Sequence, residues 1–299
     1  MKNFISKFRK SILLFVMSAI SCSSSVCARG IPTFTPGLQT VKNFLSTAIQ
    51  PVGKTCYIWG GGWNDEDTGA GDSAKHIDVC QIWKQFFEKQ NEKYNFRDYA
   101  VSKNGKKLIP IPKYLPLGLD CSGYRGWVLY NVFHTKSDEG DGYIFPHERR
   151  VSHFVESGWG ASINPKDIKD YKAGDILDKS GHVYICIGQC SDKSVVLFHS
   201  SPPGVHICGT ATPDGNKSSK AVALAKKYMT KYYPDWNKKF SHFGYVRGRE
   251  YLTEYTQLRW NIGGAMKDPD NYTKMTPEEV LNDLFDEKQT LIASKFSKK

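Results

Sequence analysis

The sequence has few cysteines, no regular glycine spacing and no long apolar run outside its first 28 residues. It holds 8 Cys and 26 Gly among 299 residues, which excludes a disulfide-dense small protein and a collagen-like chain. No later stretch is apolar and long enough to cross a bilayer, which excludes a polytopic membrane protein. Hydrophobic residues make up 40% of the chain and aromatic residues 13%, enough for a sizeable core. The sequence therefore predicts one large globular domain or two small ones.

Metal-binding patterns are also missing. No two cysteines are separated by the two residues that are typical of a zinc site, and Cys186 and Cys190, with three residues between them, stand alone. The acidic cluster at 65–72 lacks the ligand spacing and the final Glu of a calcium loop. We therefore expect neither a metal nor a cofactor, and disulfide pairing cannot be deduced from the spacings.

The first 28 residues have the order of a secretory signal peptide. Four basic residues without an acidic one precede the apolar stretch 11–20, and small residues then lead to an acceptable cleavage site at 26–28. An uncleaved membrane anchor is the main alternative, but the apolar stretch is short for a span. Lipidation at Cys22 is a further alternative that its flanking residues favour less.

The net charge is positive. The formal charge of +11 falls to +7 when the four basic residues of 1–28 are removed (11 − 4 = 7). Such a charge suits work on an acidic polymer, either nucleic acid or an anionic cell envelope. Export favours the envelope, so we expect a secreted or envelope protein without a nucleic-acid partner and without a membrane span after cleavage.

Helical patterns come first in the chain and strand patterns follow, which predicts an α+β fold. The segment 29–40 is rich in Pro, Gly and Thr and is typical of a linker. We expect irregular structure at 134–165 and one more helix after Thr276, which precedes a proline in a capping sequence. The other expected elements are helices at 38–50, 76–99, 121–133 and 218–233 and strands at 182–188, 194–200 and 205–209.

Cys121 is the cysteine with a chemical context. It lies at the start of the predicted helix 121–133, after Asp120, which can cap that helix. Unpaired N–H groups and the positive end of the helix dipole stabilise a thiolate there, and they can also hold an oxyanion. A lone cysteine is more often core filler, so the assignment as a nucleophile needs a base.

His182 can supply that base. It follows a glycine at the start of the apolar strand 182–188, where it can reach a helix N-terminus and accept a thiol proton. His199 ends the next strand and can orient His182, because a hairpin would set the two strands side by side. His206 remains an alternative third residue, although strand alternation could equally direct it to solvent.

Together these residues resemble the NlpC-type family of bacterial cell-wall cysteine peptidases. The resemblance rests on Asp-Cys-Ser-Gly-Tyr at 120–124, Gly-His-Val-Tyr-Ile at 181–185, His-Ser-Ser-Pro-Pro-Gly-Val at 199–205, and Tyr-Ile-Trp-Gly-Gly at 57–61. It covers about 41–250, with insertions near 131–172 and 200–240, and leaves 251–299 as a helical extension.

The resemblance implies a papain-like fold, in which a central helix carrying the cysteine packs on an antiparallel sheet carrying the histidines. It implies that Cys121 is the nucleophile, His182 the base, His199 the orienting residue and Tyr57 an active-site neighbour. Three aromatic residues are candidates for a substrate wall or for core packing: Trp59, Trp63 and Tyr124.

The implied activity is hydrolysis of an amide in peptidoglycan stem peptides, in particular the γ-D-glutamyl bond to the diamino acid. An amidase that cuts the muramoyl–L-alanine bond would use the same nucleophile. A catalytically silent module that binds the envelope is the alternative from another functional class.

If the export prediction is correct, the secreted protein begins near Arg29. N-terminal sequencing of secreted material measures this. A chain that begins at Met1, or a lipid attached to Cys22, would contradict it.

Overall fold

The computed structural model describes residues 32–62, 74–103, 107–141 and 151–285. The expected signal peptide lies outside these residues. No helix among the described residues is long and apolar enough to cross a lipid bilayer.

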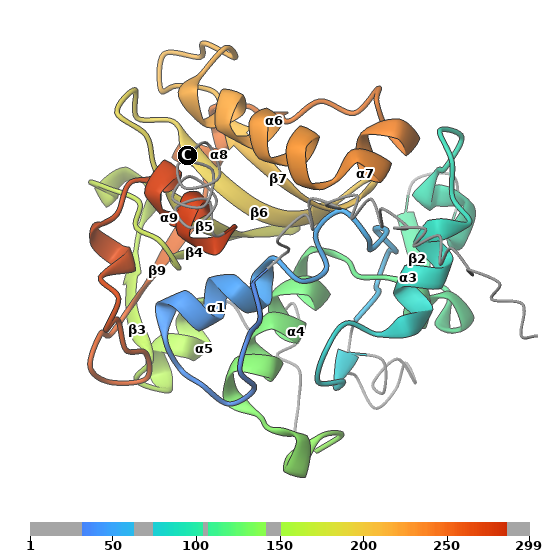
Figure 1. Ribbon diagram of the computed structural model, residues 1–299, viewed down its shortest axis with the longest axis horizontal. Coiled ribbons are helices and arrows are strands. Elements are labelled where there is room, and N and C mark those ends of the chain that lie inside the picture. The colour runs from blue at the N-terminus through green and yellow to red at the C-terminus, as the bar shows by residue number, and fades with distance from the viewer. Residues whose placement is uncertain (1–31, 63–73, 104–106, 142–150, 286–299) are drawn as a thin grey trace, which may run out of the picture.

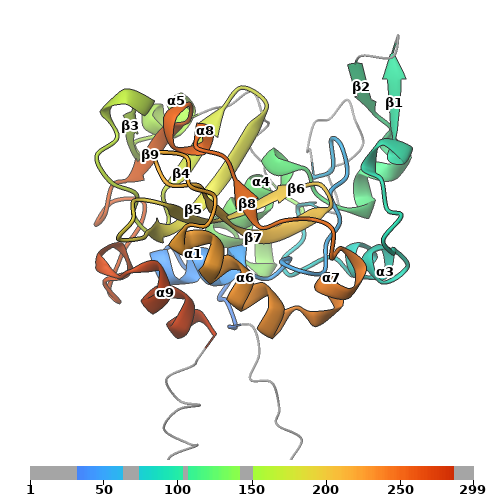
Figure 2. The same cartoon turned by 90° about the horizontal axis from the view of Figure 1, so that it is seen from above.

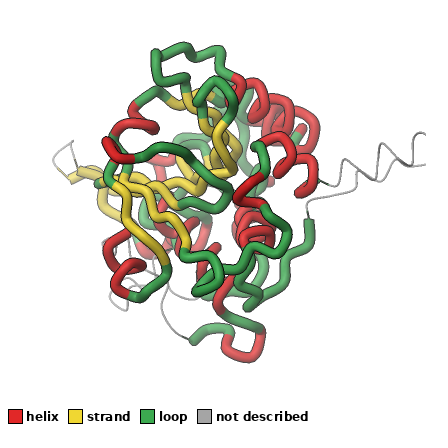
Figure 3. Tube along the Cα trace, turned by 90° about the vertical axis from the view of Figure 1, so that its left-hand side faces the viewer, coloured by secondary structure: helices red, strands yellow, loops and turns green. Residues whose placement is uncertain are grey.

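A seven-stranded sheet forms the centre of the molecule, with the strand order β3-β9-β4-β5-β6-β7-β8. All neighbouring strands pair antiparallel except β7 and β8, which pair parallel, so the sheet is mixed. Figure 3 shows these strands as one twisted band. Their bounds are β3 Gly160–Ile163, β4 Ile176–Lys179, β5 His182–Gln189, β6 Val195–Ser201, β7 Gly204–Thr210, β8 Val246–Arg247 and β9 Thr256–Trp260.

Helices pack mainly on one face of this sheet. The main core joins residues of α1, α4, α6 and α9 to the strand residues of that face, and Figure 2 shows α1, α6 and α9 on the same side of the strands. A smaller core covers the other face. It joins residues of β4–β7 to Tyr171, Leu252 and Tyr255, which lie outside the sheet. The helix bounds are α1 Val41–Ala48, α3 Gln81–Glu88, α4 Cys121–Phe133, α5 Val151–Glu156, α6 Lys220–Tyr232, α7 Pro234–Lys239, α8 Glu250–Thr253 and α9 Pro277–Leu284.

The strand β5 explains why the central strands have nearly continuous apolar sequences. Val183, Ile185 and Ile187 belong to the main core, whereas Tyr184 and Cys186 belong to the smaller one. Side chains alternate along a strand, and both faces of this strand are covered.

The remaining regular structure is short. A two-stranded hairpin, β1 (Ala100–Lys103) with β2 (Lys107–Pro110), projects from the body in Figure 2. The 3-10 turns are Phe96–Tyr99, Pro112–Leu117, Lys136–Asp138, Pro165–Asp167 and Tyr272–Lys274.

The structure confirms an α+β fold, and the expected helix at 121–133 and the three expected strands are present. The helix after Thr276 begins with the expected capping box between Thr276 and Glu279. The helix expected at 76–99 is wrong in extent, because only Gln81–Glu88 is α-helical. The residue Asp78 has a positive φ of 78°, which a helix does not permit.

Two further expectations differ from the structure, and they concern the same edge of the sheet. The stretch 134–165 contains α5 and β3, where irregular structure was expected. The segment after residue 250 is not a purely helical extension, because β9 lies inside the sheet between β3 and β4. Strand β9 has the sequence Thr-Gln-Leu-Arg-Trp. Its polar residues interrupt the apolar run that predicts an inner strand, although Gln257 is fully buried.

A loop of three glycines, 60–62, lies against the start of α4, and Figure 1 shows α1, which precedes this loop, beside α4. The backbone of Asp120 donates to the carbonyl of Gly61 at 2.9 Å, and that of Leu119 donates to the carbonyl of Cys56 at 3.2 Å. Gly60 and Gly62 have positive φ values of 75° and 83°, which favour glycine. A Cβ added to Gly123 would lie 2.0 Å from the carbonyl oxygen of Gly61.

Replacement Gly123→Ala should therefore destabilise the protein. Helix propensity alone would favour alanine by about 0.8–1.0 kcal/mol, but the collision with backbone should outweigh this and cost a net of about 1–3 kcal/mol, as overpacking does. Urea denaturation of the variant and the parent measures the difference. A variant that is as stable as the parent would show that the loop and the helix are not in such close contact.

Candidate functional site

Cys121 is the first residue of α4, and Asp120 is the N-cap residue of that helix. The Asp120 carboxylate accepts hydrogen bonds from the backbone N–H of Gly123 at 2.7 Å and from the hydroxyl of Ser122 at 2.9 Å. These bonds satisfy the helix start. The capping role that the sequence offered for Asp120 is therefore present.

The sulfur of Cys121 meets the beginning of β5. It lies 3.9 Å from the carbonyl oxygen of Gly181, and the backbone N–H of Val183 donates to it. Gly181 and Val183 flank His182 in the sequence. The thiol is thus held against the stretch of backbone that carries His182.

His182 is joined to His199. The Nε2 atom of His182 lies 2.9 Å from the Nδ1 atom of His199, and the ring centroids are 5.1 Å apart. The two residues come from neighbouring antiparallel strands, β5 and β6. The expected hairpin is therefore present, and it brings His199, not His206, against His182.

His206 is buried and not directed to solvent. It lies opposite His199 in the pairing of β6 with β7, its Nδ1 donates to the carbonyl of Gly204 at 2.7 Å, and its ring stacks on Trp236. The side chain is 1% exposed. Replacement by alanine would therefore disturb packing, which corrects the idea that His206 could face water.

Arg247, which the sequence did not single out, links the two histidines. Its Nε–H donates to Nε2 of His199 at 3.2 Å, and its terminal Nη2 group donates to Nε2 of His206 at 3.0 Å and to the hydroxyl of Ser201 at 3.1 Å. The parallel pairing of β8 with β7 places it there. No sequence signal pointed to it, because β8 has only two residues and lies far along the chain.

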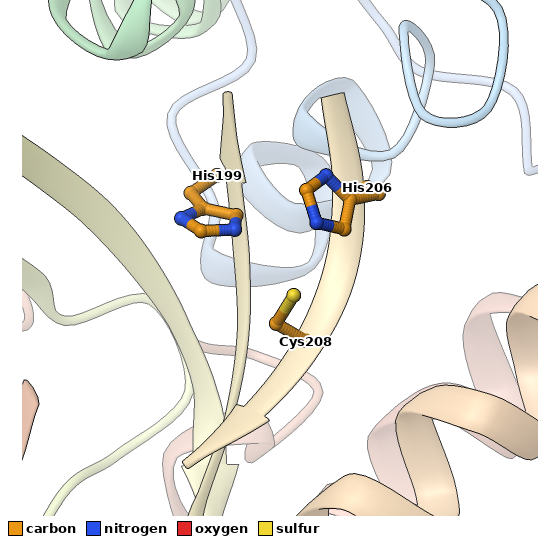
Figure 4. Close-up of side chains that lie close together, drawn as sticks. All are labelled: His199, His206 and Cys208. Atoms are coloured by element: carbon orange, nitrogen blue, oxygen red, sulfur yellow. The ribbon is translucent and has the colours of Figure 1, made fainter. Parts of the chain in front are cut away.

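His199, His206 and Cys208 form the one group among the described residues with the spacing of metal ligands. Their donor atoms lie within 4.8 Å of one another, and Figure 4 shows the two imidazoles and the thiol close together on β6 and β7. Arg247, however, donates to the Nε2 atoms of both histidines and to the Cys208 side chain. The lone pairs that zinc would use are therefore directed at a guanidinium.

Burial favours the neutral forms of Cys121 and His182. The Cys121 side chain is partly exposed. Burial nevertheless raises the pKa of its thiol to about 12, and the Asp120 carboxylate acts in the same direction. Burial lowers the pKa of His182 to about 3, and the positive charges of Arg247 and Lys179 add to this. Stabilisation of a thiolate by the helix start was expected. That expectation is wrong for this structure, because desolvation outweighs the helix N–H groups.

The candidate aromatic residues have different outcomes. Tyr57 is buried near Asp120 and Cys121, and burial, followed by the negative charge of Asp120, raises the pKa of its hydroxyl. Tyr124 is not part of a substrate wall, because it is 1% exposed and its hydroxyl donates to the carbonyl of Ala48 in the core. Trp59 is partly exposed, and Trp63 lies outside the described residues.

Two tyrosines that the sequence did not indicate border the histidines. The rings of Tyr251 and Tyr255 lie 5.7 Å and 6.3 Å from that of His182, measured between centroids. Both tyrosines come from the segment after residue 250 that was expected to be a helical extension. The motif Asp-Cys-Ser-Gly and the strand patterns gave no indication of them.

A buried ion pair lies one helical turn after Cys121. Arg125, 1% exposed, donates from Nη1 to Asp178 of β4 at 2.9 Å. Buried charges require such partners, so the pair links α4 to the sheet beneath the thiol. Its positive member also lowers the Cys121 pKa, although less than burial raises it.

The comparisons with known proteins found no relative. No family model matches the chain, no curated protein matches it, and no solved structure matches it.

Cys121 should be the cysteine that iodoacetamide modifies first. It is the only partly exposed cysteine of the six in the described residues, and the other five are buried. Because its pKa is raised, the thiolate fraction and the labelling rate should increase about tenfold per pH unit from pH 7 to 9. Peptide mapping after brief labelling at each pH measures this. A rate that is already constant below pH 7 would show a depressed pKa instead.

Proposed function

We propose that this chain is a secreted cysteine peptidase with a papain-like arrangement of an NlpC type, and that it hydrolyses an amide bond in peptidoglycan stem peptides. Cys121 is the nucleophile, His182 the general base and His199 the residue that orients His182. One observation carries the proposal: the Cys121 sulfur at the start of α4 contacts the backbone on both sides of His182, whose ring is hydrogen-bonded to His199.

The arrangement suits acyl transfer. His182 uses Nε2 for His199, so Nδ1 is the ring nitrogen left for the thiol. His182 would take the thiol proton as the Cys121 sulfur attacks the amide carbon, and the N–H groups at the start of α4 would hold the oxyanion. His182 would then give this proton to the leaving amine as the C–N bond breaks. Water, activated by His182, would then release the acid from the thioester.

The substrate class is supported less directly. The signal-peptide pattern and the net charge of +7 after its removal (11 − 4) favour an anionic envelope polymer. The motif resemblance points to the γ-D-glutamyl bond of the stem peptide. An amidase acting at the muramoyl–L-alanine bond would need the same nucleophile.

A second candidate has a specific observation in its favour. Cys121 and His182 are both uncharged in the structure at neutral pH, since the thiol pKa is raised and the imidazole pKa is lowered. A silent envelope-binding module would have no need of an activated thiol. Only an activity measurement separates it from a peptidase in a resting state.

Incubation with purified bacterial cell walls should release new amino termini, and Cys121→Ala should abolish the release. The substitution removes the nucleophile and leaves the Asp120 cap in place. Mass spectrometry of the fragments distinguishes the stem-peptide bond from the muramoyl bond. Cys190→Ala, at a buried cysteine in the turn between β5 and β6, is the matched control and should retain activity. Binding without any new amino termini from the parent protein would establish the silent module.

Replacement His199→Ala should lower kcat at least about 100-fold, the lower range for a general acid–base group. It leaves Cys121 and His182 in place but removes the hydrogen bond that orients the base. Kinetics on an isolated stem peptide measures the effect. If the variant hydrolyses the peptide at the parent rate, His199 does not orient His182.

A further inference from the structure

Arg247 determines which ring nitrogen of His199 carries a proton. A guanidinium has only donors, and its Nε–H points at Nε2 of His199 at 3.2 Å. That nitrogen must accept. Burial, with the charge of Arg247 next, holds the pKa of His199 well below its usual value, so the ring is neutral and its single proton lies on Nδ1.

The proton position on His199 determines that on His182. The Nδ1–H of His199 faces Nε2 of His182 at 2.9 Å, so this nitrogen accepts as well. A neutral His182 then carries its proton on Nδ1, the nitrogen left for Cys121. In that form Nδ1 can donate a hydrogen bond but cannot take the thiol proton.

His206 shows independently that the guanidinium acts as the donor of this cluster. Its Nδ1 donates to the carbonyl of Gly204, so its Nε2 must be the acceptor for Arg247. Arg247 also donates to the carbonyl of Val246 at 3.3 Å, and no carboxylate among the described residues forms an ion pair with it. Its charge is therefore shared among neutral acceptors on β6, β7 and β8.

We propose that Arg247 is a positioning residue that holds the His182–His199 pair in the tautomer unable to accept the Cys121 proton, so that the site rests until the guanidinium leaves His199. The proposal rests on the proposed function in taking Cys121 and His182 as the reacting pair. For His182 to become a base, its proton must lie on Nε2 and that of His199 on Nε2, where it would face the Nε–H of Arg247. The number of protons on the pair is unchanged, and the only obstacle is two donors facing each other.

The other charged and titratable groups described around His182 do not fix the position of its proton. Lys179, at the end of β4, lies over the ring of Tyr255 and pairs with Glu254. Tyr251 and Tyr255 contact the imidazole through ring faces and edges. Among the described residues, only His199 is hydrogen-bonded to the His182 ring.

Nitrogen-15 NMR of the histidine rings tests the proposal on the parent protein without any substrate. At neutral pH both His182 and His199 should carry the proton on Nδ1 and none on Nε2. A proton on Nε2 of His182 would overturn the proposal. Because this measurement needs no turnover, its result is independent of whether cell walls are cleaved.

The variant Arg247→Met removes the charge and every donor at nearly the same length. It should shift part of the His182 population to the Nε2–H form and raise the rate of Cys121 alkylation at pH 7 about tenfold, the effect of lowering the thiol pKa by one unit. Unchanged tautomers and an unchanged rate would contradict the proposal. Circular dichroism and thermal unfolding would establish that the variant is folded.

Arg247→Lys is the matched control, since it keeps the charge and a donor near His199. It should keep the parent's tautomers and the parent's slow rate of Cys121 alkylation. A Lys variant that is alkylated as fast as the Met variant would count against the proposal. All measurements need a chelator, because the Met variant leaves the donor atoms of His199, His206 and Cys208 within 4.8 Å of one another and open to zinc.

Discussion

The position of the candidate nucleophile depends on a contact between two pieces of backbone that have no side chains between them. The loop at 60–62 lies directly against the start of α4, where a Cβ on Gly123 would come within 2.0 Å of the Gly61 carbonyl. Backbone hydrogen bonds from Asp120 to Gly61 in this loop and from Leu119 to Cys56, which precedes the loop, fix the residues just before Cys121. The contact sets where the helix begins, and the helix in turn sets where the thiol meets β5.

The hairpin of β5 and β6 completes the site from the other side. It joins His182 to His199, and the next hairpin sets His206 opposite His199. The result is a row of imidazoles that ends at Arg247. Desolvation lowers the pKa of all three rings, and the charge of Arg247, joined at His182 by that of Lys179, lowers it further. Each proton is then placed by the hydrogen bond that the ring makes with its neighbour.

This burial has a consequence for reactivity. A cysteine at a helix start and a nearby histidine are usually associated with an ion pair, but here both groups are neutral at rest. Dipole effects at a helix terminus are modest at exposed sites, whereas burial of an ionised group is costly. In the proposed mechanism, activation of the thiol would follow from a change in its surroundings, such as the entry of a substrate or the displacement of Arg247.

Local patterns predicted much of this arrangement. The capped helix from Cys121 and the three strands that carry the histidines follow from residue spacing, turn residues and apolar runs, and they were found where the sequence placed them. A hairpin between β5 and the strand directly after it favoured His199 as the neighbour of His182, although the register of that hairpin could not be read from the sequence. Strand β9 was missed because its alternating polar residues resemble those of an exposed segment. In the structure they have hydrogen-bond partners inside the protein, such as Asp175, which accepts from Gln257.

The sequence by itself thus determined the place of the candidate nucleophile at a helix start and the strand that carries its candidate base, because both depend on short-range order. Only the tertiary structure decided the charge state of those groups and the presence of Arg247 and the two tyrosines around them. Burial, and contacts between residues about fifty or more positions apart, set these properties. A sequence motif encodes which groups meet along one element. The electric environment of a group depends on every element packed against it.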